Sequence, residues 1–191
     1  MMSNIKNGLK KLINYFTKFE IALWASSVLF ITVSFLLFDR SNYLSFIASI
    51  VGATALIFNA KGNPIGQFLF IIFGALYGII SYSFADYGEM ITYMGMTVPM
   101  AFISLISWLK NPYKNKKSEV EVSNIKKKEI WFLVPLTIIV TVFFYFILKE
   151  FGTANIVPST FSVTTSFVAV YLTFRRSPYF ALMYAFNDIV L

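Results

Sequence analysis

The amino-acid sequence predicts an all-α protein, a polytopic bundle of transmembrane helices, from three observations. Hydrophobic residues make up 58% of the 191 positions and aromatic residues 19%, which is more than a soluble domain of this size contains. Apolar stretches of about 16–20 residues, the length that a helix needs to cross roughly 30 Å of hydrocarbon, alternate with polar turns. The basic residues fall almost entirely in every second turn.

Seven apolar stretches define the predicted spans, and the first six have the length of a membrane-crossing helix. The stretches are Ile21–Phe38, Tyr43–Phe58, Ile65–Phe84, Ile91–Leu109, Ile130–Leu148, Ile156–Phe174 and Tyr179–Leu191. Trp24, Trp108 and Trp131 lie near the ends of spans, where indole rings are predicted to anchor to lipid headgroups.

Fourteen of the sixteen basic residues lie on one side of the zigzag that these spans describe. They are Lys6, Lys10, Lys11, Lys18, Lys61, Lys110, Lys114, Lys116, Lys117, Lys126, Lys127, Lys128, Arg175 and Arg176. The other side has only Arg40 and Lys149. Because Lys and Arg resist translocation, the asymmetry predicts a cytoplasmic N-terminus and supports the number of spans.

Residues 1–20 are predicted to form a basic amphipathic segment that precedes an additional N-terminal span, residues 21–42. Its apolar side chains recur at helical spacing, which is typical of a helix lying in the membrane interface; a partly ordered, solvated basic tail is the alternative. They are Leu9, Leu12, Ile13, Phe16 and Phe19.

The loop Lys110–Glu129 is rich in Lys, Asn, Ser and Glu, is predicted to be solvated, and separates a front group of spans from a rear group. A basic turn ending in proline opens the third span (Lys61–Pro64) and again the seventh (Arg175–Pro178), 114 residues later. A shift of four spans preserves orientation, so the groups are predicted to be parallel repeats, an arrangement of some transporter folds, including SWEETs.

The predicted units are a first three-helix repeat (residues 43–109), a cytoplasmic loop with a linker helix (residues 110–155) and a second repeat (residues 156–191). The second repeat lacks its third helix. Its last span ends after 13 residues, about 20 Å of helix, where a free carboxylate inside the bilayer would be costly. The natural chain is therefore expected to continue past Leu191.

The third span carries a polar and aromatic stripe along one helical face. Its members are Gln67, Phe70, Gly74, Tyr77 and Ser81. Gly74 and Gly78 have the small-xxx-small spacing that lets a neighbouring helix approach closely. The stripe predicts one wall of a substrate site; ordinary packing, with Gln67 hydrogen-bonding across the bundle, is the alternative.

In the seventh span Tyr184, Asn187 and Asp188 share a face at i, i+3 and i+4. Asp188 is the carboxylate that lies within a predicted span rather than at its end, and an ionisable group at that depth is a candidate for function. The alternative is that Asp188 pairs with a basic residue of a helix beyond Leu191. Pro99, within the fourth span, is predicted to kink that helix, either as a flexing point or as a static packing feature.

The chain contains no cysteine and no histidine. Their absence from the sequence excludes thiol chemistry, disulfides, histidine acid–base catalysis and nearly all zinc or haem sites. No metal, cofactor or enzymatic activity is therefore expected. The net charge of +7 sits in cytoplasmic connections, where anionic headgroups explain it more simply than nucleic acid does.

Four segments together resemble PnuC-type vitamin transporters. They are Asn59–Gln67, Gly74–Tyr82, Tyr87–Met90 closing on Pro99-Met100, and Tyr179–Asp188. The resemblance implies a SWEET-like arrangement of three, one and three helices, here with an extra N-terminal span, in a homotrimer of the bacterial cytoplasmic membrane. It also implies facilitated diffusion of nicotinamide riboside, which cytoplasmic phosphorylation traps.

The sequence lacks the Trp-x-x-Trp motif of characterised members, so thiamine and riboflavin remain alternative substrates. A flat pyridinium cation suits aromatic faces and a nearby carboxylate, and a ribose suits amide and hydroxyl partners; thiamine is a flat aromatic cation as well. A membrane subunit or assembly factor that transports nothing is the alternative of another class. The polar stripes count against it.

Overall fold

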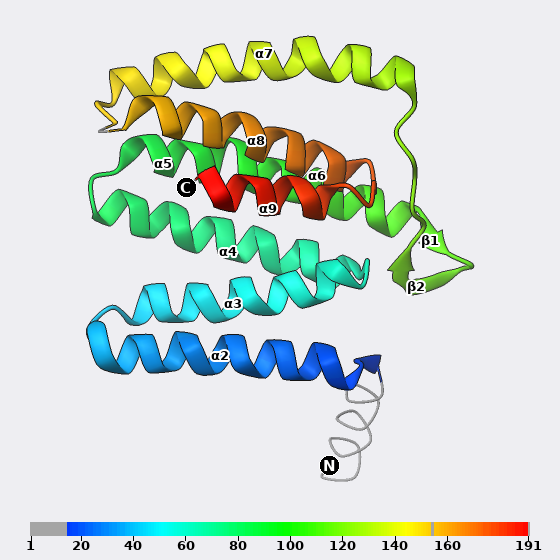
Figure 1. Cartoon of the computed structure of the whole chain (residues 1–191), viewed down its shortest axis with the longest axis horizontal. Coiled ribbons are helices and arrows are strands. Elements are labelled where there is room, and N and C mark those ends of the chain that lie inside the picture. Colours follow the sequence, from blue (N-terminus) through cyan, green and yellow to red (C-terminus); the bar gives the residue numbers. More distant parts are fainter. Residues whose placement is uncertain (1–14, 154, 191) are drawn as a thin grey trace.

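The computed structural model describes residues 15–153 and 155–190 as a series of helices that run back and forth across one layer (Figure 1). The elements are α2 (Lys18–Phe38), α3 (Tyr43–Ala60), α4 (Pro64–Ser83), α5 (Tyr87–Thr92), the π-helical turn η1 (Tyr93–Thr97), α6 (Val98–Lys110), β1 (Pro112–Tyr113), β2 (Lys116–Val120), α7 (Lys127–Glu150), α8 (Ile156–Phe174) and α9 (Phe180–Val190).

Within the described residues, six helical segments are long and apolar enough to cross a membrane, and they correspond to the first six predicted spans. The prediction of an all-α transmembrane bundle is confirmed. The fourth span begins at Tyr87, four residues before the predicted start. The predicted interfacial helix falls mostly on residues 1–14, which lie outside the described residues. Of its apolar face, Phe16 packs edge-on against Phe58 at 5.3 Å between ring centroids, and Phe19 is 76% exposed.

The starts of the helices follow from local sequence. The Thr17 hydroxyl accepts a hydrogen bond from the Glu20 amide, and the Glu20 carboxylate accepts one from the Thr17 amide. This reciprocal pair is a capping box, and it begins α2. Asn63 caps α4, which has Pro64 in its first turn, where a missing N–H costs nothing. These caps fix where the turns end and so set the register of each helix.

The fourth span is irregular just before Pro99. Pro99 has no N–H to donate to the carbonyl of Gly95, four residues earlier. The preceding residues adopt a π-helical turn, in which the Val98 amide donates to the Tyr93 carbonyl, five residues back. The π-helical turn therefore lies directly before α6, with one residue between it and Pro99; the kink predicted at Pro99 stays a prediction.

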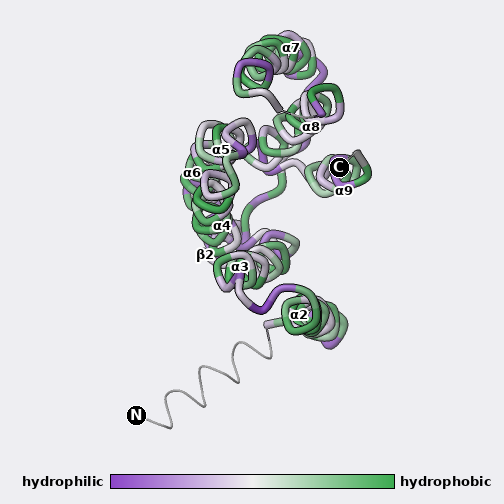
Figure 2. Tube along the Cα trace, turned by 90° about the vertical axis from the view of Figure 1, so that its left-hand side faces the viewer, coloured by the Kyte–Doolittle hydropathy of each residue, from purple (hydrophilic) through white to green (hydrophobic). Residues whose placement is uncertain are grey.

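Viewed along the helices, the chain forms a curved layer (Figure 2). Neighbours in this layer are α2, α3, α4, α5–α6, α8 and α7, and α9 packs against α8 on the concave side. The buried apolar cluster lies where α7 and α8 meet the fourth span, and includes Met96, Phe144, Leu148, Val163 and Phe167. By contrast, α2 has no buried residue. The division into repeats stays a prediction.

The turns gather at two ends of the bundle (Figure 1). At one end, here called the basic end, the α3–α4 turn, the β1–β2 hairpin and the α8–α9 turn meet. The Val120 amide donates to the Gly62 carbonyl (2.9 Å), and the Ser123 amide donates to the Arg176 carbonyl (3.1 Å). The α2–α3, α4–α5 and α7–α8 turns lie at the opposite end, here called the far end.

The hairpin is an addition to the sequence prediction, because the lysine-rich loop carries no alternating apolar pattern from which a strand could be expected. Its strands are antiparallel and its turn is made by Lys114 and Asn115, both at positive φ (45° and 62°). Successive positive φ values match the twist of a tight hairpin. The lysine side chains remain exposed.

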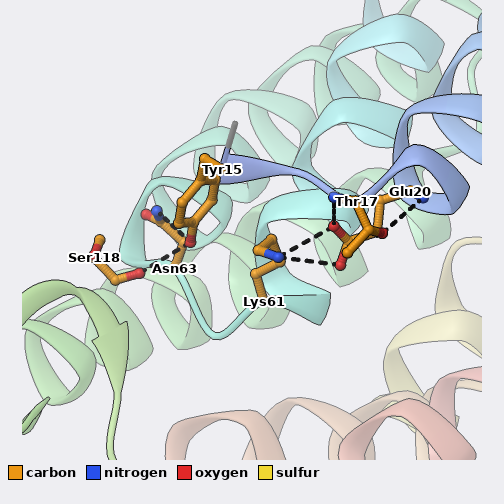
Figure 3. Close-up of polar contacts among 6 residues, drawn as sticks. All are labelled: Tyr15, Thr17, Glu20, Lys61, Asn63 and Ser118. Carbon is orange, nitrogen blue, oxygen red and sulfur yellow. Dashed lines mark hydrogen bonds and ion pairs between the residues drawn. The ribbon is translucent and has the colours of Figure 1, made fainter. Parts of the chain in front are cut away.

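A network of polar contacts joins the start of α2 to the rest of the basic end (Figure 3). Lys61 Nζ lies 3.2 and 3.1 Å from the two carboxylate oxygens of Glu20 and 5.0 Å from the centre of the Tyr15 ring. The Tyr15 hydroxyl accepts from Asn63 Nδ2 (3.2 Å) and donates to the Ser118 carbonyl (3.2 Å). The added N-terminal span is thus held to the α3–α4 turn and to the hairpin.

Candidate functional site

A polar cavity of about 230 Å³ lies between the fourth span, α8 and α9. It is lined by Asp86, Glu89, Thr92, Tyr93, Thr97, Leu148, Thr153, Ser159, Ser162, Val163, Ser166 and Asn187. Asp86 and Thr153 belong to turns at the far end, whereas Thr97 and Ser166 lie about midway along their spans. The cavity therefore runs from the far end toward the middle of the bundle.

Hydroxyl groups of α8 form one wall. Ser159, Ser162 and Ser166 follow each other at i, i+3 and i+7, so a single helical face carries them. Asn187 of α9 is only 7% exposed, and its Oδ1 accepts from Ser162 (3.1 Å), Thr165 (2.6 Å) and Ser166 (3.1 Å). Its amide nitrogen forms no hydrogen bond with the described residues, which leaves a donor at the cavity wall.

The opposite wall combines carboxylates with an aromatic ring. Asp86 caps α5 by accepting the Glu89 amide (3.1 Å), and Glu89 Oε2 accepts from the Ser81 hydroxyl (2.9 Å). The Tyr93 ring packs against Tyr77 at 5.2 Å between centroids. No Lys or Arg is among the described lining residues, so the cavity has a negative mouth.

Two of the predicted third-span residues line a small hollow of about 10 Å³ that shares Thr97 with the cavity. Gln67 is buried and donates to Asn59 Oδ1 across to α3 (2.8 Å). Phe70 lies nearly parallel to Tyr184, with centroids 6.2 Å apart. Gln67, Phe70 and Tyr184 are thus brought together between the two groups of helices, at the inner limit of the cavity.

Tyr77 and Ser81, the other predicted members of the stripe, line neither hollow. Instead they hold residues that do, because Tyr77 packs on Tyr93 and Ser81 donates to Glu89. Gly74 and Gly78 face the fourth span closely: a Cβ at Gly74 would lie 2.8 Å from Val98 Cγ2, and one at Gly78 would lie 2.7 Å from Met94.

The predicted face of the seventh span is divided by the structure. Tyr184 and Asn187 turn toward α8 and the hollows, whereas Asp188 is exposed and lines neither of them. A helix advances 100° per residue, so a neighbour of an inward-facing residue can point outward.

The carboxylates of the cavity are Asp86 and Glu89, which precede the predicted start of the fourth span. The run Ser159–Ser166 places six hydroxyl side chains in an apolar span. This clustering is the sequence signal from which the α8 wall could have been found.

Below the small hollow, contacts at the basic end close the path. Trp108 is 1% exposed and donates through Nε1 to the Thr173 carbonyl (2.8 Å); it is not the interface anchor that its place in the sequence suggested. Ser107 donates to the Phe174 carbonyl (3.0 Å). Arg175 forms an ion pair with Glu129, and this hydrogen bond raises the pKa of Arg175.

Comparisons with known proteins agree on one family. The family model described as nicotinamide mononucleotide transporter matches residues 42–191. The nicotinamide riboside transporter PnuC of Neisseria mucosa is 30% identical over 128 residues, which are 65% of this chain and 48% of that protein. The chain therefore spans about half the length of the curated relative that it matches.

A crystal structure of the vitamin B3 transporter PnuC has the same fold. It superposes with a TM-score of 0.77 at 23% identity, over 92% of this chain and 75% of that one. Because the family model covers most of the sequence, and the cavity lies within the matched residues, the chain belongs to the nicotinamide mononucleotide transporter family, as its resemblance to PnuC-type transporters predicted.

Proposed function

We propose that the protein carries nicotinamide riboside across the bacterial cytoplasmic membrane by facilitated diffusion, with its N-terminus in the cytoplasm. The observation that carries the proposal is the polar cavity between the fourth span, α8 and α9. A closed bundle of apolar helices would have no use for a buried amide and half-buried serine hydroxyls within its spans, below two exposed carboxylates, because polar groups are costly in hydrocarbon. A subunit that transports nothing would not need them.

The cavity offers a partner for each part of the ligand. The pyridinium ring is a flat cation, which the Glu89 carboxylate and the Tyr93 ring face can stabilise. The ribose hydroxyls can exchange hydrogen bonds with the α8 serines and the free amide donor of Asn187. Glu89 takes the role that the sequence suggested for Asp188, since Asp188 lies outside the cavity.

Charge favours the riboside over its phosphorylated form. The described lining of the cavity contains Asp86 and Glu89 and no basic side chain, so a phosphate group would meet like charge without compensation. We extend the same reasoning to Gln67, Phe70 and Tyr184, which stand at the inner limit of the cavity and would contact the substrate as it moves toward the basic end.

The conformation is that of a carrier open at one end. The cavity reaches the far end, while Trp108 and its neighbours close the basic end. With the N-terminus in the cytoplasm, the far end faces outward and the substrate enters there. Movement between an outward-open and an inward-open state would need no cofactor. We further propose a homotrimer, which the mass of the purified protein in detergent would test.

The test is a calorimetric titration of the purified protein with four ligands. These are nicotinamide riboside, its neutral reduced form, its mononucleotide and thiamine. Strongest binding of nicotinamide riboside, with the mononucleotide and the reduced form at least tenfold weaker, would support the proposal; tenfold corresponds to about 1.4 kcal/mol. Strongest binding of thiamine would assign the protein to another vitamin. Binding of none of them would contradict a carrier of this class.

A further inference from the structure

A groove of about 390 Å³ runs between α2 and α3 near the far end, on the other side of the bundle from the polar cavity. It is lined by Phe30, Ile31, Ser34, Phe35, Asp39, Asn42, Ser45, Phe46 and Ser49. Its walls are aromatic and aliphatic, but three serine hydroxyls and one carboxylate open into it. It faces the hydrocarbon, because α2 has no buried residue and Phe30 and Phe38 are both strongly exposed.

The three serines differ from the other hydroxyl residues of these two helices. Ser26, Ser27, Thr32 and Thr54 each donate to a carbonyl of the preceding turn of their own helix. Within the described chain, no hydrogen bond satisfies the side chains of Ser34, Ser45 or Ser49. Hydroxyls without partners are costly next to lipid tails, so these three serines can donate to a ligand in the groove.

Asp39 lines the groove at its mouth, and Arg40, of opposite charge, follows it in the turn. Asp39 Oδ1 accepts from the Ser41 hydroxyl (2.7 Å) and the Ser41 amide (3.2 Å), and the bond from the hydroxyl holds the pKa of Asp39 below its usual range. Arg40 is exposed and uses Nε to bond the Leu36 carbonyl (2.6 Å). Its two terminal nitrogens donate to no described residue, so a cation that does not itself line the groove follows the anion at the mouth.

Depth gives the last constraint. At 1.5 Å per residue, Ser45 lies about 5 Å along α3 from Asn42, Ser34 about 8 Å along α2 from Asp39, and Ser49 about 10 Å from Asn42. The headgroup layer of a bilayer is roughly 5–8 Å thick on each side. With Asp39 and Arg40 among the headgroups, the serines stand at the level of the glycerol esters and just below it.

We propose that the α2–α3 groove binds one phospholipid with a primary-amine headgroup, phosphatidylethanolamine, from the leaflet at the far end. The ammonium group pairs with Asp39, the phosphate with Arg40, and the ester carbonyls accept from the serine hydroxyls, while an acyl chain lies along Phe30, Ile31 and Phe35. The site is separate from the polar cavity and does not depend on the substrate proposed for it.

The test uses native mass spectrometry of the purified full chain with phosphatidylethanolamine, phosphatidylcholine and phosphatidylglycerol of identical acyl chains. We expect one retained lipid, with phosphatidylethanolamine preferred. Asp39→Asn keeps the acceptor for Ser41. It should lower the affinity for phosphatidylethanolamine about fivefold, the effect of one charge near a membrane surface, and leave the affinity for phosphatidylglycerol unchanged. Arg40→Gln should weaken all three lipids alike, because each contains a phosphate.

The hydroxyl part of the site is tested separately. The double variant Ser45→Ala, Ser49→Ala should weaken every lipid, whereas Ser26→Ala, whose hydroxyl bonds its own helix, should weaken none. A preference for phosphatidylethanolamine that survives Asp39→Asn, or equal retention of all three lipids by the wild type, would overturn the proposal. A change of oligomeric state in these variants without a change in lipid retention would overturn it as well, and would assign the groove to a second copy of the chain.

Discussion

Trp108 Nε1 donates a hydrogen bond of 2.8 Å to the carbonyl of Thr173, and this contact ties α6 to the C-terminal end of α8. The two helices belong to the front and rear groups of spans, which the polar cavity separates nearer the far end. The buried indole therefore stands where the two groups must part for the basic end to open.

Replacing Trp108 with Phe should shift the protein toward a state open at the basic end. The Thr173 carbonyl keeps its bond from the Arg176 amide (2.9 Å), so the change removes one hydrogen bond and part of the packing of a buried ring. The loss is at least about 1 kcal/mol, or roughly fivefold in population. The sequence has no cysteine, so Ser104→Cys, in the closed region, reports opening through its rate of thiol labelling.

The matched control for this change is Trp131→Phe, because Trp131 is 82% exposed. It should leave the labelling rate at position 104 unchanged. Equal labelling in the wild type and in Trp108→Phe would mean that the indole fills space and does not hold the basic end closed.

Orientation in the membrane is tested by two further single cysteines. Ser118 lies in the hairpin at the basic end, and Ser83 lies at the end of α4 near the far end; both are exposed. Because basic connections stay in the cytoplasm, an impermeant thiol reagent applied to intact cells should label Ser83→Cys and spare Ser118→Cys. The reverse pattern would invert the proposed topology.

Glu89→Gln should weaken binding of nicotinamide riboside and spare its neutral, reduced form. The change removes the charge but keeps an acceptor for the Ser81 hydroxyl, so the fold is preserved. A partly desolvated charge contact contributes on the order of 2–3 kcal/mol, or about 30- to 150-fold in affinity. Calorimetric titration with both ligands measures the difference.

Asp188→Asn is the control for Glu89→Gln, since Asp188 is exposed and lines neither hollow. It should bind both ligands as the wild type does. If Asp188→Asn lowers the affinity for the cationic ligand more than Glu89→Gln does, Asp188 has the role that the sequence suggested for it.

Asn187→Ala should lower both thermal stability and affinity for the riboside. The Ser162 and Ser166 hydroxyls lose their acceptor, at a cost of about 1–3 kcal/mol for polar groups left unpaired, while Thr165 keeps the carbonyls of its own helix. The ribose also loses an amide donor. Ile189→Ala, at an 81% exposed position two residues away, should change neither. Unchanged stability in Asn187→Ala would show that α9 is held to α8 by apolar contacts alone.

Much of the fold could be predicted because apolar length and charge alternation are properties of each segment taken alone. The positions of α3, α4, α7 and α8 follow from them to within a few residues. The hairpin could not be predicted, because β2 is held by the α3–α4 turn and the residues after it by the α8–α9 turn. Both turns are distant in sequence, and no pattern within the loop announces them.

The site was predicted in part, for a related reason. Asn187 and Gln67 are polar residues in apolar spans, which must find partners inside the bundle, and both are buried. Asp188 satisfied the same criterion but points outward, because sequence spacing gives a face to within about 100° and not the neighbour that covers it. Glu89 was missed because the helix begins earlier than its apolar run, and Trp108 because the sequence does not show which helix covers it.

The hairpin shortens the tether between the front and rear groups. The Gly62–Val120 and Arg176–Ser123 backbone bonds fasten the connecting loop to both groups at the basic end. A small rotation of one group about this end displaces the far ends of its helices by more than it displaces the basic ends. Among the described residues, side-chain hydrogen bonds join the front and rear helices at the basic end, from Ser107 and Trp108, and none spans the cavity mouth. Opening the basic end itself must first release these bonds, at about 1 kcal/mol each, which makes the two halves of a transport cycle energetically unequal.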